Sequence, residues 1–508
     1  MVNAPLKHIV FVPCPAWGHL RPGMKTALRL VEKFQDLFIC SYMSLFVYQT
    51  ELHKAVKYLD TQPPAYTRRI RLVTEPTNGP SVTAGQLTDI LLSLEVSFGS
   101  WIVKETQQAT ILQIDGRPVN PPSMIIEDLY TGGVGLARKE AHNLPVVGWW
   151  LMTAGSLITI LQAAKFREEM AALQYSSLYN VLLKEGQAES KDTHDRLVSL
   201  PGIPSHYAWE STTQDLQDAN PLTAYIISRC HNMIKNIDTF FCCTAFEMEP
   251  LVAATLPDIF GKPLRAYCVG PSVDLVPPHK PDPKSPVTQF LDRAYAENGA
   301  HSVIYISFGT LFFPLPSTVP HLMAALDEIP KAGFKIVFAL SSECATLDKS
   351  WMDAHIDAGN AIFPEWANQT AVLEHPAIHY FLSHGGWNSS TEAIVHGVPM
   401  IFWPMAGDQP MNAIQVASVH DCGFEFLQVR TGDARSVAYR NGFEVEILGT
   451  EDAVRDEMKQ ILKMSKGVRG KHQRMNVRML GKVVTDSLGP GGSGDIALWK
   501  FGQAVGLA

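Results

Sequence analysis

The sequence lacks the cysteine patterns of a disulfide-bonded secreted domain or of a zinc site. Its eight cysteines are scattered at positions 14, 40, 230, 242, 243, 268, 344 and 422, with no C-x-x-C spacing. Histidines 375, 379 and 384 lie close together in sequence, but one precedes a proline and another enters a strand, so they share no helical face. We therefore expect reduced thiols, a cytoplasmic location and no metal ligands.

Clustered positive charge is also missing. The 508 residues carry 42 lysines and arginines against 50 aspartates and glutamates, which gives a formal net charge of -8. The one basic run, GVRGKHQRMNVR, is short and is interpreted as a solvated helix face. This charge distribution argues against a nucleic acid or an anionic membrane as partner.

The sequence has no apolar run that is typical of a signal peptide or a membrane span. The first apolar run is short and is broken by Pro13 and Pro15. Residues 144–164 carry no charge and are long enough to cross a bilayer. One proline, two glycines and four polar residues interrupt them, so we predict a buried strand, a turn and the start of a helix.

Strand and helix patterns alternate along both halves of the chain. The segment HIVFVPC is followed by a helical stretch from about Arg21 to Phe34, and SMIIEDL, LPVVGWW and TFFCCTAF read as further strands. In the second half HSVIYISFGT, KIVFAL, AIFPEW, HYFLSH and PMIFWP are strands between helices. This alternation predicts two α/β domains with parallel sheets.

The proline-rich stretch VGPSVDLVPPHKPDPKSPV is the best linker between these halves. We predict an N-terminal domain over residues 1–268, a linker over 269–287, a C-terminal domain over 288–485, and a final segment 486–508 that packs back on the N-terminal domain. Residues 166–219 are polar, helix-prone and then broken at LPGIP, and we interpret them as an insertion near the acceptor side.

The segment from Trp366 to Gln409 carries the groups that a nucleotide sugar needs. Trp366 offers a face to a planar base, and Glu392 offers an acceptor to ribose hydroxyls. Between them a strand from Tyr380 to Ser383 turns through two glycines into a helix from about Asn388 to His396.

The start of that helix predicts an anion site. The first N–H groups and the positive dipole end of a helix attract a diphosphate, here beside His384, Asn388 and Ser389. Asp408 and Gln409 follow the next strand, where their side chains are placed to bind sugar hydroxyls.

The first half of the chain supplies a candidate base. His19 follows a strand and a glycine at the start of a helix, which is the edge where open α/β sheets bind ligands. A helix N-terminus disfavours the charged imidazole, which suits a base that must be neutral at pH 7. Asp128 ends the strand MIIED and is the natural partner of that base, whereas Glu127 should point to the opposite face. A structural histidine in a turn and an aspartate that caps the next helix are the alternatives.

The stretch from Trp366 to Gln409 resembles the donor-binding box of the family 1 UDP-dependent glycosyltransferases, closest to the plant small-molecule enzymes. The family pattern W-A-P-Q, H-C-G-W-N-S, E and D/E-Q matches Trp366-Ala367-Asn368-Gln369, His384-Gly385-Gly386-Trp387-Asn388-Ser389, Glu392 and Asp408-Gln409. Asn368 replaces the usual proline and Gly385 the usual cysteine, which indicates a lineage outside the plant enzymes.

The N-terminal G-H-x-x-P element of the family matches Gly18, His19 and Pro22. The resemblance implies that His19 deprotonates the acceptor hydroxyl and that Asp128 holds His19. It also implies that Thr310, in YISFGT, contacts the diphosphate and that Thr153 reaches the sugar.

The resemblance thus implies a GT-B fold, with two Rossmann-like domains facing across a cleft, and an inverting transfer of a hexose. The donor is UDP-glucose or another UDP-sugar, with no metal or other cofactor, and Asp408-Gln409 favours glucose. The acceptor is a small hydrophobic molecule with a hydroxyl group, and we expect a monomer.

Two other functions stay open at this point. One is a sugar-nucleotide-binding protein without turnover, against which His19 and Asp128 argue. The other is a nicotinamide oxidoreductase, because Gly133-Val134-Gly135 stands between a strand and a helix as in a dinucleotide fingerprint. Arg138 occupies the third glycine position of that fingerprint, and binding of UDP or NAD would separate the two enzymes.

Overall fold

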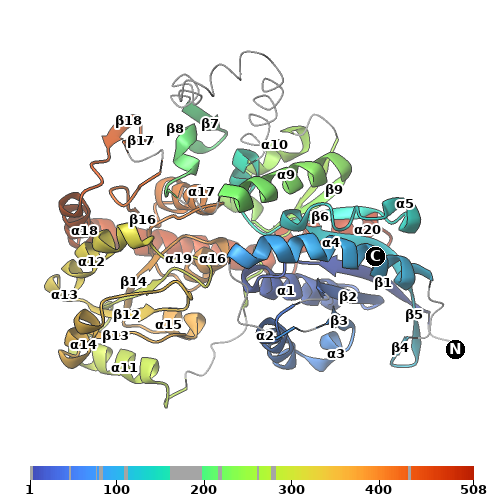
Figure 1. Cartoon of the computed structure of the whole chain (residues 1–508), viewed down its shortest axis with the longest axis horizontal. Helices are drawn as coiled ribbons and strands as arrows, with labels where there is room; N and C mark the ends of the chain where they lie inside the picture. Colours follow the sequence, from blue (N-terminus) through green and yellow to red (C-terminus); the bar gives the residue numbers. More distant parts are fainter. Residues whose placement is uncertain are drawn as a thin grey trace. The chain divides into compact units, whose positions relative to one another are not determined.

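The computed structural model describes residues 4–44, 47–75, 77–78, 84–107, 112–160, 197–215, 220–259, 263–275, 282–432 and 436–508. The chain divides into two compact α/β units (Figure 1). Unit 1 contains Met1–Lys165, Asp218–Asp274 and Asp486–Ala508, and unit 2 contains Phe166–Gln217 and Leu275–Thr485. The chain thus passes from unit 1 to unit 2 at Asp274, inside the predicted linker.

Unit 1 is built on a parallel sheet with the strand order β10-β9-β6-β5-β1-β2-β3, and the short β4 pairs antiparallel with β5. Strands β1, β5 and β6 are mostly apolar and buried where they pair, as expected for strands covered by helices on both faces. The strands are β1 (Leu6–Val12), β2 (Leu37–Ser44), β3 (Ile70–Thr74), β4 (Gln113–Ile114), β5 (Arg117–Asp128), β6 (Val146–Trp150), β9 (Thr239–Cys242) and β10 (Arg265–Cys268).

Helices connect these strands and pack on the sheet (Figure 1). They are α1 (Trp17–Lys33), α2 (Gln49–Asp60), α3 (Pro64–Thr67), α4 (Ala84–Gln107), α5 (Lys139–His142), α9 (Asn220–Asn236), α10 (Pro250–Ile259) and α20 (Ser493–Ala504). Helix α20 belongs to unit 1, since Phe501 packs edge-on against Phe241 with ring centroids 4.5 Å apart. Asp495 adds an ion pair with Lys33.

Unit 2 is built on a second parallel sheet with the strand order β13-β12-β11-β14-β15-β16. Its strands are β11 (Val303–Ser307), β12 (Lys335–Ala339), β13 (Ala361–Ile362), β14 (Ile378–Ser383), β15 (Met400–Phe402) and β16 (Gly423–Glu425). Its helices are α11 (Pro286–Asn298), α12 (Val319–Leu326), α13 (Glu328–Lys331), α14 (Lys349–Asp357), α15 (Gln369–Glu374), α16 (Trp387–Val395), α17 (Gln409–Ala413), α18 (Glu451–Lys466) and α19 (Val468–Leu488).

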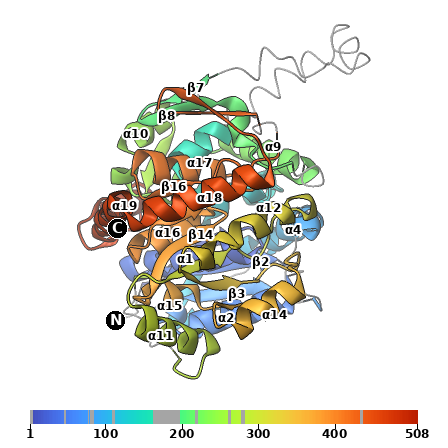
Figure 2. The ribbon, with the colours of Figure 1, turned by 90° about the vertical axis from the view of Figure 1, so that its left-hand side faces the viewer.

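The core of unit 2 lies between this sheet and two amphipathic helices. Leu322 and Leu326 of α12 and Met458 of α18 join one buried cluster with strand residues such as Ile306. Figure 2 shows α12 and α18 over the sheet strands β14 and β16. Polar side chains on the outer face of α18 leave its apolar stripe facing the core.

The described part of the predicted insertion belongs to unit 2, so its expected place in the N-terminal domain of residues 1–268 was wrong. It forms a hairpin of β7 (Leu197–Leu200) and β8 (Ile203–Tyr207) beside the hairpin of β17 (Val437–Arg440) and β18 (Phe443–Glu446) (Figures 1 and 2). The reason is a buried ion pair: Glu210 Oε2 accepts from Arg430 at 2.8 Å and lies 2.6 Å from Arg440. Residues 166–196 and 216–219 lie outside the described residues.

The uncharged stretch 144–164 folds as predicted in its described part. Strand β6 is followed by a turn and by a helix that begins at Ala154, while residues 161–164 lie outside the described residues. In the described ranges of the chain, we find no helix that is both long and apolar enough to span a membrane.

Candidate active site

His19 lies in the first turn of α1, which follows β1 directly in unit 1. The helix begins at Trp17, four residues earlier than predicted, after Ala16 in an extended conformation. Pro22 therefore lies inside the helix, where near the N-terminus it removes only one backbone hydrogen bond. The early start places the His19 side chain, which is 13% exposed, next to the end of β5.

Asp128 is the last residue of β5 and binds His19 directly. The Nδ1 atom of His19 lies 2.6 Å from Oδ2 of Asp128. The same carboxylate accepts the backbone N–H groups of Cys14 at 3.2 Å and Tyr130 at 3.0 Å. Asp128 thus caps the short helical turn Leu129–Thr131, which was the alternative role for this aspartate. It also binds His19.

These contacts orient the imidazole. A carboxylate fixed by two backbone donors accepts the Nδ1 proton of His19, and the other ring nitrogen, Nε2, then carries the lone pair that a base needs. The ring also lies 5.1 Å from the Tyr130 ring, which in turn packs edge-on against Trp150 at 5.6 Å. The pair can therefore accept a proton from a group bound beside an aromatic surface.

Glu127 points to the opposite face of β5 and fills the glycine loop that resembles a dinucleotide fingerprint. Its carboxylate accepts the N–H of Gly135 at 2.7 Å and the hydroxyl of Thr131 at 3.0 Å. A side chain at position 135 would clash with it, because a Cβ there would lie 2.2 Å from Glu127 Oε2. Burial raises the pKa of Glu127 to about 8. The loop binds the chain's own carboxyl group, which argues against a nicotinamide site there.

Thr153 is buried in unit 1 and caps the helix that follows it. Its hydroxyl oxygen accepts the N–H of Ser156 at 3.1 Å. This is the ordinary role of a threonine before a helix. A contact of Thr153 with the sugar stays a prediction.

In unit 2, three of the predicted donor-binding residues lie in contact. Gln369 Nε2 donates to Glu392 Oε2 at 2.7 Å and to Ser389 Oγ at 3.2 Å. Tyr305 donates to the Gln369 oxygen at 3.4 Å. The sequence spacing did not indicate Tyr305, because it lies on β11, 64 residues upstream of its partner at the start of α15. Together these residues fix the carboxylate predicted to bind ribose hydroxyls.

His384 lies between the end of β14 and the turn after β11. Gly309, at φ +77°, approaches so closely that a Cβ there would be 3.0 Å from the imidazole. The next residue, Thr310, is exposed, so the predicted diphosphate residues Thr310 and His384 belong to adjoining loops. Burial lowers the pKa of His384 to about 4. With this pKa the imidazole is neutral at pH 7, so it offers a hydrogen bond and no full positive charge.

Helix α16 begins at Trp387 with Gly386 as its N-cap, a residue without a side chain to cover the helix end. Asn388 and Ser389 occupy its first turn, and the Trp387 side chain is buried. The preceding Gly385 adopts φ +83°, and a Cβ there would lie 2.9 Å from the Phe402 ring. Glycine at the position where the family has cysteine therefore fits this backbone.

Asp408 and Gln409 lie at the start of α17, beside the same turn. Gln409 Oε1 accepts the N–H groups of Met405 at 2.8 Å and Ala406 at 3.0 Å. Asp408 accepts from Asn412, whose amide also donates to the Gly385 carbonyl at 2.9 Å. Asn412 is a buried link that sequence reasoning missed, although its place one helical turn after Asp408 was a signal for it.

Trp366 is 69% exposed, in contrast to its neighbour Ala367, which is buried. An indole with this exposure is not a core residue. Trp366 therefore has no packing role that would compete with stacking on a base.

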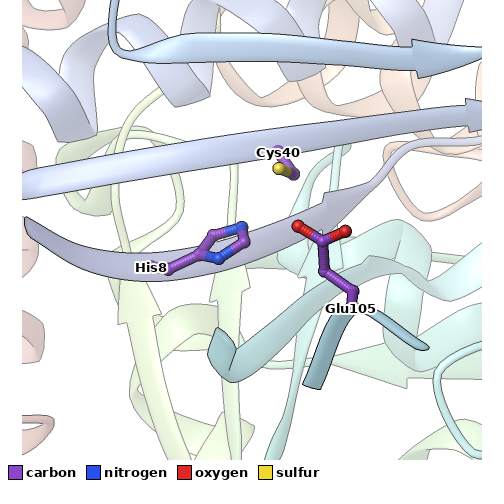
Figure 3. Close-up of side chains that lie close together, drawn as sticks. All are labelled: His8, Cys40 and Glu105. Atoms are coloured by element: carbon purple, nitrogen blue, oxygen red, sulfur yellow. The ribbon is translucent and has the colours of Figure 1, made fainter. Parts of the chain in front are cut away.

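His8, Cys40 and Glu105 form a cluster in unit 1 whose ligand atoms lie within 4.8 Å of one another (Figure 3). Arg71 also belongs to it, because its guanidinium donates to Cys40 Sγ at 3.1 Å and pairs with Glu105. This permanent positive charge opposes a divalent cation. The cluster is therefore better described as a partly buried ion pair than as a metal site.

Comparisons with known proteins agree with this geometry. The family model described as "UDP-glucoronosyl and UDP-glucosyl transferase" matches residues 266–433. The UDP-glycosyltransferase eriJ of Hericium erinaceus is 25% identical over 492 residues, which cover 92% of each chain. A UDP-glucose flavonoid 3-O-glucosyltransferase 6 of Fragaria ananassa is 23% identical and covers 90% of this chain and 94% of the relative.

Solved structures show the same fold over nearly the whole chain. Medicago truncatula UGT71G1 complexed with UDP-glucose has a TM-score of 0.70 at 19% identity and covers 98% of each chain. Phytolacca americana UGT2 complexed with UDP-2fluoro-glucose and pterostilbene has a TM-score of 0.69 at 22% identity and covers 99% of this chain and all of that one. Residues 266–433 therefore match the UDP-glucuronosyl and UDP-glucosyl transferase family, and the chain as a whole is similar to UDP-glycosyltransferases and has the GT-B fold.

Proposed function

We propose that the protein transfers glucose from UDP-glucose to a hydroxyl group of a small hydrophobic acceptor, with inversion at the anomeric carbon. The observation that carries this proposal is the 2.6 Å contact between His19 Nδ1 and Asp128 Oδ2 at the start of α1. A protein that only binds sugar nucleotides has no need of an oriented base.

In this mechanism His19 Nε2 takes the proton of the acceptor hydroxyl while the acceptor oxygen attacks the anomeric carbon. The bond from that carbon to the UDP oxygen breaks in the same displacement. Asp128 stabilises the imidazolium that forms, since its carboxylate already lies against Nδ1. One displacement at one carbon gives inversion.

The start of α16 stabilises the departing UDP. Its positive dipole end and first-turn N–H groups are suited to a diphosphate, and His384 adds a hydrogen bond. Because burial lowers the pKa of His384 to about 4, the helix end supplies the larger share of the charge stabilisation in this proposal. Trp366 stacks on the uracil, and Glu392, held by Gln369, binds the ribose hydroxyls.

The surroundings of His19 favour an aromatic or otherwise apolar acceptor. Tyr130 lies next to the base and in turn contacts Trp150 and Met152, with its hydroxyl 3.4 Å from the Met152 sulfur. Among the similar proteins, one is named a flavonoid glucosyltransferase and another was solved with pterostilbene. We propose phenolic, terpenoid or polyketide alcohols for this protein.

The experiment that tests this function is a product screen. Purified protein is incubated with several UDP-sugars and a panel of hydroxylated aromatics and terpenoids, and products are weighed by mass spectrometry. We expect a hexose adduct of a hydrophobic acceptor, with UDP-glucose as the best donor. Tight UDP binding with no product from any acceptor would instead support a binding protein without turnover.

We expect activity to survive removal of divalent metal ions. The helix end and His384 supply the stabilisation of the diphosphate, and the donor motif has no cluster of carboxylates to hold a cation there. Initial rates measured with excess EDTA should fall by no more than a minor fraction. A strict need for Mg²⁺ or Mn²⁺ would contradict this account of leaving-group stabilisation.

The choice of glucose is tested at Gln409. Gln409→Ala should lose more activity with UDP-glucose than with a UDP-deoxyglucose that lacks the hydroxyl bound by this side chain. Gln409→Glu is the matched variant, because it keeps an oxygen for the Met405 and Ala406 amides but has no amide donor. Equal losses with every sugar, measured as kcat/KM, would mean that Gln409 only shapes the loop.

We also propose a cytoplasmic location. It rests on the cysteines, none of which is paired in the described residues, and on their scattered positions.

A further inference from the structure

The peptide unit between Pro404 and Met405 is bound on both sides. Its N–H, on Met405, donates to Gln409 Oε1 at 2.8 Å. Its carbonyl, on Pro404, accepts the Thr213 hydroxyl at 2.9 Å and the Gln214 amide at 3.3 Å. The C=O and N–H of a trans peptide point in opposite directions, so Thr213 and Gln214 fix the plane that in turn fixes Gln409.

Thr213 and Gln214 are themselves held firmly within unit 2. Thr213 is fully buried and Gln214 is 1% exposed. The Gln214 amide also donates to the Val429 carbonyl at 3.0 Å, and its oxygen accepts the Thr431 hydroxyl at 3.0 Å. The N–H of Thr431 donates to the Thr213 carbonyl at 3.0 Å.

This segment is anchored independently of the loop that it contacts. Just before it, Glu210 forms the buried ion pairs with Arg430 and Arg440, and Arg440 also pairs with Glu425 of β16. The segment is thus tied to the edge of the sheet before it reaches Pro404. A chain of buried hydrogen bonds with such an anchor holds its last member in one orientation.

The consequence is a defined orientation of the Gln409 amide. Two backbone N–H groups, from Met405 and Ala406, can bind only the oxygen of that side chain, so the NH₂ group points away from them. If the peptide plane at Pro404 rotated, the Met405 N–H would leave Gln409 and the amide could turn. The sugar-binding geometry therefore depends on groups about 190 residues upstream.

We infer that Thr213 and Gln214 are positioning residues for the donor sugar, acting through the Pro404–Met405 peptide on Gln409. The inference rests on the proposed function, in which Gln409 binds the glucose hydroxyls. It gives the segment 203–215 a role in donor selection in addition to packing.

The test compares UDP-glucose with UDP. Thr213→Val keeps the shape of the side chain but removes its hydroxyl, and we expect KM for UDP-glucose to rise about twofold to tenfold, as for the loss of one buried hydrogen bond. The Kd of UDP, which has no sugar, should stay unchanged, as should the melting temperature within a few degrees. Gln214→Leu removes more contacts and should raise KM further.

Two controls make the readout specific. Thr213→Ser keeps the hydroxyl and should retain the wild-type KM. Ser211→Ala removes a hydroxyl of the same segment that binds only the nearby Ala208 carbonyl, and it should have no effect on donor binding.

Three outcomes overturn the inference. One is an equal change of UDP-glucose KM and UDP Kd in Thr213→Val, another is a lower melting temperature with no donor effect, and the third is no change at all. Should Gln214→Leu fail to fold, the comparison of Thr213→Val with Thr213→Ser still tests the inference. A donor-selective Gln409→Ala with a silent Thr213→Val rejects this inference alone, whereas a Gln409→Ala without donor selectivity rejects the proposed function on which it rests.

Discussion

Replacing His19 with alanine should lower kcat by about a hundredfold or more with an alcohol acceptor, as expected for the loss of a general base. UDP affinity should stay nearly unchanged, because His19 lies in unit 1 and the residues predicted to bind UDP lie in unit 2. Steady-state kinetics and UDP titration on the same variant measure the two quantities. Phenols of low pKa should lose less, because they need less help to ionise.

The matched control is His472→Ala, which removes an exposed histidine of α19. It should leave turnover and UDP binding as they are. Turnover retained in His19→Ala with a weakly acidic alcohol would show that another group is the base. Asp128→Asn should lower kcat as well, because an amide at this position no longer favours the tautomer with its proton on Nδ1.

The second large effect is expected at Trp366. Replacing it with alanine removes an aromatic platform worth about 1–3 kcal/mol, so UDP should bind about fivefold to a hundredfold more weakly. The uracil lies far from the reacting carbon, and its contact is similar in the ground and transition states. KM for UDP-glucose should therefore rise while kcat changes less.

Stability separates this result from a packing defect. Trp366 is 69% exposed, so its truncation leaves no core cavity and the melting temperature should change little. Trp366→Phe should recover part of the affinity. Trp499→Ala, which removes another indole that is about half exposed, should leave UDP binding unchanged. A lower melting temperature without a selective donor defect would contradict stacking.

The sequence predicted the pairing of His19 with Asp128 because both positions follow from local rules. A strand that ends at Asp128 and a helix that starts near His19 place their ends at the same edge of a parallel sheet. The helix start itself was predicted four residues too late, at Arg21. The proline at position 22 is typical of a first helical residue, but here a helix begun at Trp17 contains it.

Long-range contacts within unit 2 could not be predicted in this way. The polar segment before residue 216 has no period that indicates where it packs, and it was assigned to the wrong domain. Its place is decided by the buried charges of Glu210, Arg430 and Arg440, and Glu210 lies more than 200 residues before its two partners in sequence. The contact of Gln369 with Glu392 could not be predicted either. Both residues were recognised from the motif, but their hydrogen bond to each other was not.

The position of His384 was predicted better than its electrostatics. The sequence indicated that His384 stands beside a helix end, but the depth of its burial depends on Gly309 of a distant turn. That burial lowers the pKa of His384 and makes it a neutral hydrogen-bonding group.

The stereochemistry of the product tests the central claim most directly. UDP-glucose carries an α-linked sugar, and one displacement by an acceptor oxygen activated at His19 must give a β-glucoside. Proton NMR of the purified product, recorded before any equilibration, distinguishes the two anomers by the coupling of the anomeric proton. We expect the β-anomer alone. An α-glucoside would contradict a single displacement and the roles assigned to His19 and Asp128.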